Sequence, residues 1–323
     1  MADFTAAKFC FRLRPEGMLL LPPAQRGAIL RGAFGTALRR IICHDWRRGC
    51  LECPTLHDCL FQRLFAPVTF PAAERLSRNQ NPPRGFVIEY PLDGADSFGP
   101  ETTFDVGMTL VGELVLLLPY VVVPLKELGR AGIGPGRGRF RLAAVTCHNP
   151  LSGEQADLYS ERTGSFRNSC LSVTWADVAR RAETLDPRRL TLDFLTPTRL
   201  TTGSRPGQPA RPVRRPEFGV LLRRLRDRVN ALSTFYCGGP LDIDFRGLGE
   251  RAEAVRLVRD ETRWVEASRR SRAGYSQDMA GFVGRATYEG DLREFLPLIA
   301  WGELLHVGKG SVFGQGWYRI VDE

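Results

Sequence analysis

Four cysteines lie close together in the first part of the chain and could bind a metal ion. Cys43, Cys50, Cys53 and Cys59 follow the spacing C-x6-C-x2-C-x5-C, in which one C-x-x-C pair is flanked by two more cysteines. Four thiolates suit a tetrahedral structural zinc ion, and such a closed shell leaves no position open for a substrate. The sequence therefore predicts a structural zinc site, with reduced cysteines or a labile iron–sulfur centre as the alternatives.

Histidine is the side chain best suited to proton transfer at neutral pH, and the chain has four. His44 follows the first cysteine of the cluster, so it is a candidate acid or base and also a candidate zinc ligand, as is His57. His306 directly precedes a glycine-rich segment. It is a second candidate for proton transfer, or a cation that caps the end of a helix. His148 has no supporting context.

Two glycine-rich segments, GIGPGRGRF (132–140) and GKGSVFGQGW (308–317), are candidate anion-binding loops. Each follows a predicted helix and enters a predicted strand. The dinucleotide-binding fingerprint has the opposite order, and no Walker motif is present. Two interpretations remain, a pair of tight turns that cover a sheet or a backbone clamp on RNA or DNA phosphates. Lys309, between two glycines, favours the clamp because its charge has little to pack against.

The composition favours a large folded core and a polyanionic partner. The chain has 323 residues, 43% of them hydrophobic, and a formal net charge of +9. Arginine dominates its 45 basic residues, which a GC-rich genome also explains, but the charge excess itself favours nucleic acid. No signal peptide is recognisable. The apolar run at 110–125 contains Glu113 and two prolines, which favours a buried strand and turn over a membrane span. We expect a soluble, cytoplasmic protein.

Hydrophobic periodicity predicts the elements that must position these residues. Leu30, Phe34, Leu38 and Ile41 form an apolar stripe at helical spacing. Strands are predicted at 7–15, 85–90, 102–119, 190–197, 282–290 and 317–321 and at the end of 132–145, helices at 24–43, 124–132, 217–235 and 291–307, and a Pro/Arg/Gly-rich loop at 201–218.

The two halves of the chain follow one plan, and each ends with a helix, a glycine-rich loop and a strand. This repetition predicts an internal duplication of a β-α-β-β-α-β unit. The fold class is therefore α+β, with two tandem ferredoxin-like (RRM-like) domains at 1–187 and 188–323. The boundary is placed where LDPRR breaks the pattern, and the four-cysteine cluster is an insertion in the first domain.

The segment GFVGRATYEGDLREFLPLIAWGELLHVGKGSVFGQGWYRI (281–320) resembles the C-terminal part of the CRISPR-associated repeat-processing endoribonucleases of the RAMP superfamily. DFLTPTRL (193–200), GGPLDIDFRGL (238–248), GAILRGAFGTALRRIIC (27–43) and the cysteine pattern are also similar to that family. The resemblance covers most of the chain and is most specific in the last 40 residues. It implies two ferredoxin-like domains and metal-independent cleavage of precursor CRISPR RNA within its repeats.

This activity needs a base for the 2′-hydroxyl, an acid for the leaving 5′-oxygen, and cations or N–H groups beside the phosphate. The expected ends are a 2′,3′-cyclic phosphate and a 5′-hydroxyl. The resemblance implies a catalytic histidine in or near the first helix, which makes His44 a candidate, and His306 matches the family motif before the second glycine-rich segment. With Lys309 as the point charge beside the phosphate, the candidate catalytic residues are His44, His306 and Lys309. Thr36 stands where the family would be expected to carry histidine, so catalysis by arginine without histidine remains open.

Arginine–phosphate contacts should supply most of the RNA affinity, although any single arginine could instead be a solvated surface charge. The expected partners are the CRISPR repeat RNA, retained after cleavage, and other subunits of a CRISPR effector complex. The alternative functions are a non-catalytic RNA-binding subunit of such a complex, a general RNA chaperone or a redox-sensing cysteine protein. The candidate RNA-binding residues are Arg31, Arg39, Arg40, Arg137, Arg139, Arg211, Arg214, Arg215, Arg285, Gly308, Gly310, Gly314 and Gly316.

Overall fold

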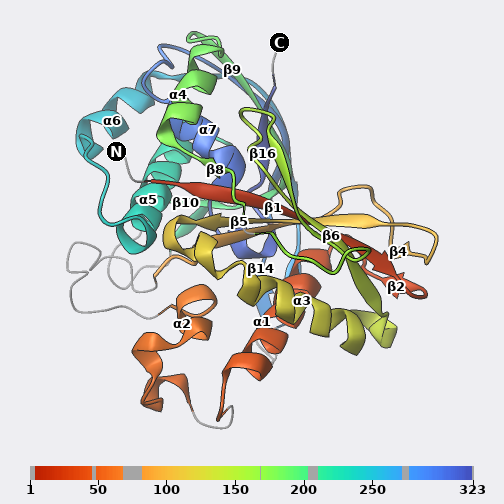
Figure 1. Cartoon of the computed structure of the whole chain (residues 1–323). Helices are drawn as coiled ribbons and strands as arrows, with labels where there is room; N and C mark the ends of the chain where they lie inside the picture. The colour runs from red at the N-terminus through yellow and green to blue at the C-terminus, as the bar shows by residue number, and fades with distance from the viewer. Residues whose placement is uncertain are drawn as a thin grey trace. The chain divides into compact units, whose positions relative to one another are not determined.

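The computed structural model describes residues 4–45, 49–67, 82–167, 169–202, 210–270 and 276–321 (Figure 1). The chain forms two compact units. The N-terminal unit comprises Asp3–Ser172 and Ala231–Gly239, and the C-terminal unit comprises Val173–Asn230 and Pro240–Glu323. Both contain helices and antiparallel sheets, which confirms the predicted α+β class.

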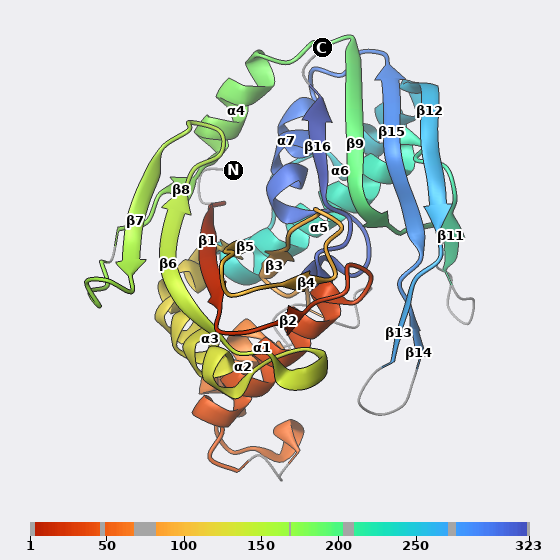
Figure 2. The same cartoon turned by 90° about the vertical axis from the view of Figure 1, so that its right-hand side faces the viewer.

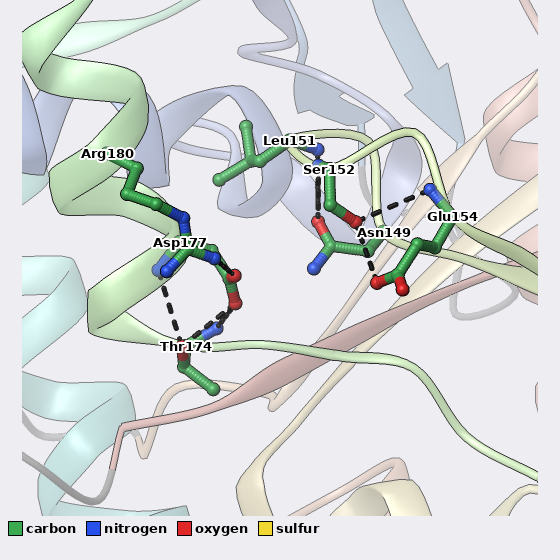
Figure 3. Close-up of polar contacts among 7 residues, drawn as sticks. All are labelled: Asn149, Leu151, Ser152, Glu154, Thr174, Asp177 and Arg180. Atoms are coloured by element: carbon green, nitrogen blue, oxygen red, sulfur yellow. Dashed lines mark hydrogen bonds and ion pairs between the residues drawn. The ribbon is translucent and has the colours of Figure 1, made fainter.

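Helix α4 (Trp175–Glu183) belongs to the C-terminal unit, so the division between the units falls before Val173 and not between residues 187 and 188 as predicted. A capping box starts this helix. Thr174 Oγ1 accepts a hydrogen bond from the Asp177 N–H at 3.4 Å, and Asp177 Oδ2 accepts one from the Thr174 N–H at 2.7 Å (Figure 3). Trp175 then packs edge-on against Trp301, with ring centroids 5.7 Å apart. This contact holds α4 within the C-terminal unit.

The main sheet of the N-terminal unit has the strand order β3-β5-β1-β6-β7, and all neighbours along this path are antiparallel. The β6–β7 hairpin turns at Asn149, whose Oδ1 accepts hydrogen bonds from the N–H groups of Leu151 and Ser152 at 3.0 and 3.3 Å (Figure 3). The elements are β1 (Ala6–Pro15), β2 (Leu19–Leu20), α1 (Arg26–Ile42), α2 (Leu60–Leu64), β3 (Phe86–Glu89), β4 (Ser97–Phe98), β5 (Phe104–Val111), α3 (Pro119–Ala131), β6 (Phe140–His148) and β7 (Gln155–Ser160).

The sheet of the C-terminal unit has the antiparallel order β12-β15-β9-β16 (Figure 2). The short hairpin β13–β14 continues from the ends of β12 and β15. The elements after β8 (Ser172–Val173) and α4 are β9 (Arg189–Thr198), β10 (Leu200–Thr202), β11 (Arg211–Val213), α5 (Phe218–Tyr236), α6 (Phe245–Arg251), β12 (Arg256–Val265), β13 (Ser268–Arg270), β14 (Ser276–Asp278), β15 (Gly281–Glu289), α7 (Leu296–Leu305) and β16 (Tyr318–Val321).

The two sheets share one arrangement when the strands are counted within each unit. The first strand, β1 or β9, lies between the third strand, β5 or β15, and the fourth, β6 or β16; the second strand, β3 or β12, pairs with the third. One helix follows the first strand and another precedes the fourth. The glycine-rich loops therefore occupy equivalent places, each between the second helix and the fourth strand.

Alternation of apolar and polar residues explains why β1 forms. Phe9, Phe11 and Leu13 are buried, while Cys10 and Arg12 point to the other face. In α1, the predicted stripe packs inward at Leu30, Phe34 and Leu38, and the ring of Phe34 meets Phe86 of β3 edge-on at 6.5 Å. The stripe ends one turn early, because Ile41 is 44% exposed.

The apolar run at 110–125 is helical where a strand and turn were predicted. β5 ends at Val111, and Gly112, with φ 54°, turns the chain into a 3-10 segment, Gly112–Leu117, and then α3. Val121 and Val122 are β-branched, but they are buried on the inner face of α3, so tertiary packing overrides their strand propensity. No helix in the described ranges is both long enough and apolar enough to span a membrane.

Helix α7 is shorter than the predicted 291–307. It begins at Leu296, beside Pro297 in its first turn, a position where the missing N–H of proline is tolerated. It ends at Leu305 because His306 has φ 59° and ψ 166°, a conformation that a helix does not allow. On the sheet side, the Tyr318 hydroxyl donates a hydrogen bond to the Ile299 carbonyl at 2.6 Å, which fixes β16 beside α7.

Candidate nucleic-acid interface

The second glycine-rich loop is a compact structure in the C-terminal unit. Its four glycines, Gly308, Gly310, Gly314 and Gly316, all have φ between 70° and 84°. A Cβ atom on Gly308 would lie 2.5 Å from the Arg199 carbonyl oxygen, and one on Gly316 would lie 1.8 Å from the Val307 carbonyl oxygen. The loop therefore needs glycine both for its backbone angles and for its close approach to neighbouring backbone.

Several amide groups of this loop are already used inside the protein. The N–H groups of Val307 and Gly316 donate to the carbonyls of Gly316 and Pro197 at 2.9 and 3.1 Å, and Lys309 N–H donates to Arg199 at 3.1 Å. The N–H groups of residues 313 and 315 donate to the carbonyl of residue 310, and the N–H group of residue 314 donates to the carbonyl of residue 311. This geometry favours the tight-turn interpretation, since these donors do not face a phosphate. The side chain of Lys309 is exposed and is what the loop presents to a ligand.

His306 is buried, with 0% of its surface exposed. Its ring stacks parallel to Trp317, with centroids 5.8 Å apart, and its Nδ1 lies 3.2 Å from the Gln315 carbonyl oxygen. The Gln315 amide in turn donates to the Met279 carbonyl at 3.0 Å. A fully buried ring does not reach an RNA substrate. The placement at the end of α7 therefore favours a structural role for His306 over the predicted catalytic one.

The predicted arginines of the C-terminal unit lie on its surface. Arg214 stacks on Trp264, with its guanidinium carbon 4.7 Å from the ring centroid, and Arg215 Nε lies 3.2 Å from Asp260 Oδ2. Arg285 is exposed on β15, with its Nε 3.8 Å from an oxygen of Asp193. Arg211 is exposed on β11. Residues 203–209 of the predicted basic loop lie outside the described residues.

Two of the three predicted arginines on α1 are anchored on aromatic rings. The guanidinium carbon of Arg31 lies 4.1 Å from the Phe65 ring centroid, and that of Arg39 lies 6.0 Å from the Phe61 ring. Both side chains are half-buried, while Arg40 is exposed. The rings hold the two charges at the surface of α1 and restrict their motion.

Thr36 and the first glycine-rich loop also belong to the N-terminal unit. Thr36 Oγ1 donates to the Gly32 carbonyl at 2.8 Å, one turn earlier in α1. In the loop, Arg137 has φ 52° and its Nε donates to the Ala131 carbonyl at 3.3 Å. Arg137 and Arg139 are both exposed. This loop, too, offers arginine side chains at its surface.

The predicted metal ligands are not brought together as a metal site. Across the described parts of the chain, no group of three or more His, Cys, Asp or Glu side chains is arranged to hold a metal ion. The four cysteines at 43, 50, 53 and 59 are half-buried and are not joined by disulfides. Cys53 Sγ instead lies 3.3 Å from Thr55 Oγ1. His44 is exposed directly after α1 and Cys43.

A cluster of three polar side chains on the sheet of the N-terminal unit was not predicted from the sequence. Lys8 Nζ lies 2.6 Å from Glu89 Oε2, and Lys8 is the register partner of His148. Burial, and then the charge of Lys8, lower the pKa of His148. The alternation in the predicted strands places Lys8 on the polar face of β1, but only strand pairing brings Glu89 and His148 to it. Trp264 was also missed, because β12 was not predicted.

Comparison with known proteins agrees with this architecture. Residues 4–171 match the family model AF_1859_N, described as an N-terminal domain, and residues 192–318 match the model described as CRISPR-associated endoribonuclease Cas6. An uncharacterized protein of Archaeoglobus fulgidus is 24% identical over 312 residues, which cover 93% of this chain and 92% of that protein.

Solved structures of Cas6 proteins have a similar fold. A Cas6 product complex is 18% identical with a TM-score of 0.57, over 98% of this chain and 100% of that one. Thermus thermophilus Cas6 is 18% identical with a TM-score of 0.56, over 99% and 100%. A further Cas6 product complex is 22% identical with a TM-score of 0.52, over 98% and 100%. At these identities the likeness concerns the fold.

Two antiparallel sheets of one strand order, each with a glycine-rich loop and exposed arginines, define an α+β protein whose fold is similar to that of the Cas6 structures. The chain belongs to the family of the matching N-terminal-domain model, and its residues 192–318 match the CRISPR-associated endoribonuclease Cas6 domain, in agreement with the resemblance seen in the sequence.

Proposed function

We propose that this endoribonuclease cleaves precursor CRISPR RNA within its repeats without a catalytic metal and then retains the product. A 2′-hydroxyl attacks the adjacent phosphate in line, which leaves a 2′,3′-cyclic phosphate and a 5′-hydroxyl. The observation that carries this proposal is the match of residues 192–318 to the Cas6 family, together with exposed cationic side chains in both units. We further propose that both units are ferredoxin-like domains, since each has the β-α-β-β-α-β order.

The proposed chemistry divides between proton transfer and charge neutralisation. His44 is the proposed acid or base, because it is exposed beside α1, whereas His306 is buried. Lys309 is proposed to neutralise charge on the scissile phosphate, since it is the exposed cation of the second loop. Arg40, Arg139 and the surface arginines of the C-terminal unit would contact other phosphates.

A second function rests on Thr36. Its hydroxyl is engaged with the Gly32 carbonyl, and Thr36 stands where a catalytic histidine would be expected from the family resemblance. A chain that lacks its general base would bind repeat RNA without cleaving it and would serve as an RNA-binding subunit. One solved match is titled a partial Cas6-RT-Cas1--Cas2 complex. We therefore propose CRISPR proteins as partners under either function.

Cleavage in the presence of EDTA separates the two functions. The purified chain is incubated with 5′-labelled cognate repeat RNA and excess EDTA, and the ends of the products are identified. The enzyme should give a 5′-hydroxyl fragment, and His44→Ala should slow its formation at least tenfold. His57→Ala is the matched control, because His57 is exposed in the same cysteine-containing segment. Tight binding of RNA that stays intact would exclude the enzyme and support the binding subunit.

A further inference from the structure

Two cysteines outside the cluster at 43–59 lie side by side within the N-terminal unit. The Sγ atoms of Cys147 and Cys170 are 3.7 Å apart, although 23 positions separate the residues in the chain. Cys147 is on β6 and is fully buried, whereas Cys170 is exposed in the segment that follows β7. A disulfide bond is about 2.0 Å long, so a small movement of the exposed Cys170 side chain closes the gap.

The surroundings of Cys147 stabilise its thiolate. The backbone N–H of Leu171 donates a hydrogen bond to Cys147 Sγ at 3.3 Å, and the Cys170 thiol lies within hydrogen-bonding distance of the same sulfur. The bond from Cys170 lowers the pKa of Cys147 despite burial, which acts in the opposite direction, and the Leu171 N–H lowers it further. The same thiol–thiol contact, followed by burial, raises the pKa of Cys170. These contacts favour a thiolate on Cys147, the sulfur that solvent does not reach, over one on Cys170.

We propose that Cys147 and Cys170 are a redox-active thiol pair, which a small-molecule disulfide converts into an intramolecular disulfide. Cys170 reacts first because it is exposed. As its sulfur attacks one sulfur of the small disulfide, its proton passes to the neighbouring Cys147 thiolate, the S–S bond breaks, and the first small thiolate leaves. Cys147 then attacks Cys170 Sγ, and its proton leaves with the second small thiol. The protein loses two protons and two electrons, and the small disulfide gains them.

The new bond links two parts of the N-terminal unit. Residues 169–172 lead from β7 toward Val173, where the C-terminal unit begins. A disulfide from Cys170 to β6 fixes this segment to the sheet, beside the contact that Leu171 already makes with Cys147. It also closes the β6–β7 hairpin covalently, which reduces the conformational freedom of the unfolded chain. The oxidised protein is therefore expected to be more stable than the reduced one.

Mass spectrometry tests the pairing directly. The fully reduced chain is equilibrated with excess oxidised glutathione, the remaining thiols are blocked with iodoacetamide, and the digest is searched for linked peptides. The expected product joins the peptides of residues 147 and 170 and has lost two hydrogens. Cys10→Ser should leave this link intact; burial and then Asp105 raise the pKa of Cys10 to about 11. Cys170→Ser should abolish it, and this exposed position tolerates serine.

Thermal unfolding gives a second readout that does not depend on RNA cleavage. Oxidation should raise the melting temperature of the natural chain by several degrees, and it should not change that of Cys170→Ser. Glutathione attached to Cys170 without a link to Cys147, or two free thiols after equilibration, would overturn the proposal. Both results leave the proposed endoribonuclease activity untouched, so the two ideas succeed or fail separately.

Discussion

Replacement of Gly316 by alanine tests whether the second glycine-rich loop is a close-packed turn. Gly316 has φ 70°, and an alanine Cβ there would lie 1.8 Å from the Val307 carbonyl oxygen. Gly136 in the first loop is the matched control: its φ is 76°, but nothing lies within 4 Å of its Cβ position. Both substitutions impose a left-handed alanine, and only the first also requires backbone movement.

The magnitudes follow from the contacts. A left-handed non-glycine residue costs about 1–2 kcal/mol, which should be the whole effect of Gly136→Ala. In Gly316→Ala the backbone must also shift, and this disrupts two hydrogen bonds, Gly316 N–H to Pro197 at 3.1 Å and Val307 N–H to Gly316 at 2.9 Å. Each bond contributes about 1 kcal/mol, so Gly316→Ala should cost about 3–4 kcal/mol.

Urea unfolding of both variants, followed by circular dichroism and tryptophan fluorescence, measures the difference. Trp301 and Trp317 lie in the C-terminal unit, so fluorescence reports on the second loop's surroundings. An equal loss of stability in the two variants would refute the close-packing argument. A large loss of RNA affinity in Gly316→Ala, measured where the variant is still folded, would restore the backbone-clamp interpretation.

Four further predictions concern individual side chains. His306→Phe keeps a ring against Trp317 but cannot transfer a proton, so the single-turnover cleavage rate should stay within about threefold; a hundredfold loss in the folded variant would make His306 catalytic. Lys309→Ala should weaken RNA binding about fivefold and reduce the salt slope of log K by about one, measured by filter binding from low to high salt; an unchanged slope would contradict a phosphate contact. Because the pKa of His148 is lowered in the folded protein, the unfolded chain binds more protons near and below pH 6.5. The contribution of His148 to folding stability is therefore complete above that pH and is lost as the pH falls. His148→Gln should flatten the fall in melting temperature between pH 7 and 5, and a fall as steep as in the natural chain would assign it to other groups. Metal analysis decides between the zinc site that the cysteine spacing predicts and the open arrangement of these cysteines in the structure: the zinc site requires about one zinc ion per chain that is lost in Cys53→Ser, and equal zinc content in both proteins would refute it.

Local patterns predicted much of the fold. The period-2 alternation around Phe9 and the helical stripe around Phe34 located β1 and α1, since each element buries one face. The strand predicted at 102–119 ends at Val111, and the rest of the apolar run at 110–125 is helical, because its valines pack on the inner face of α3 despite their strand propensity. β12 was missed because its charged residues are exposed on both faces of the strand.

The candidate site was less predictable than the fold. His306 and Lys309 are three positions apart and both looked functional, but one is fully buried and the other is exposed. Arg31 and Arg39 looked like free surface charges, and the structure places them on aromatic rings of a neighbouring helix and turn. Burial and pairing across the chain decide these roles, and neither is encoded in the local spacing of residues.

The sequence by itself determined the α+β class, the duplicated plan with its two glycine-rich loops, and the family, because periodicity and motifs are local properties of the chain. Only the tertiary structure decided which loop amides are already hydrogen-bonded, which histidine reaches solvent, and that Cys147 meets Cys170 across 23 positions. Those outcomes depend on strand register and close packing between distant segments, which a pattern of residue types does not contain.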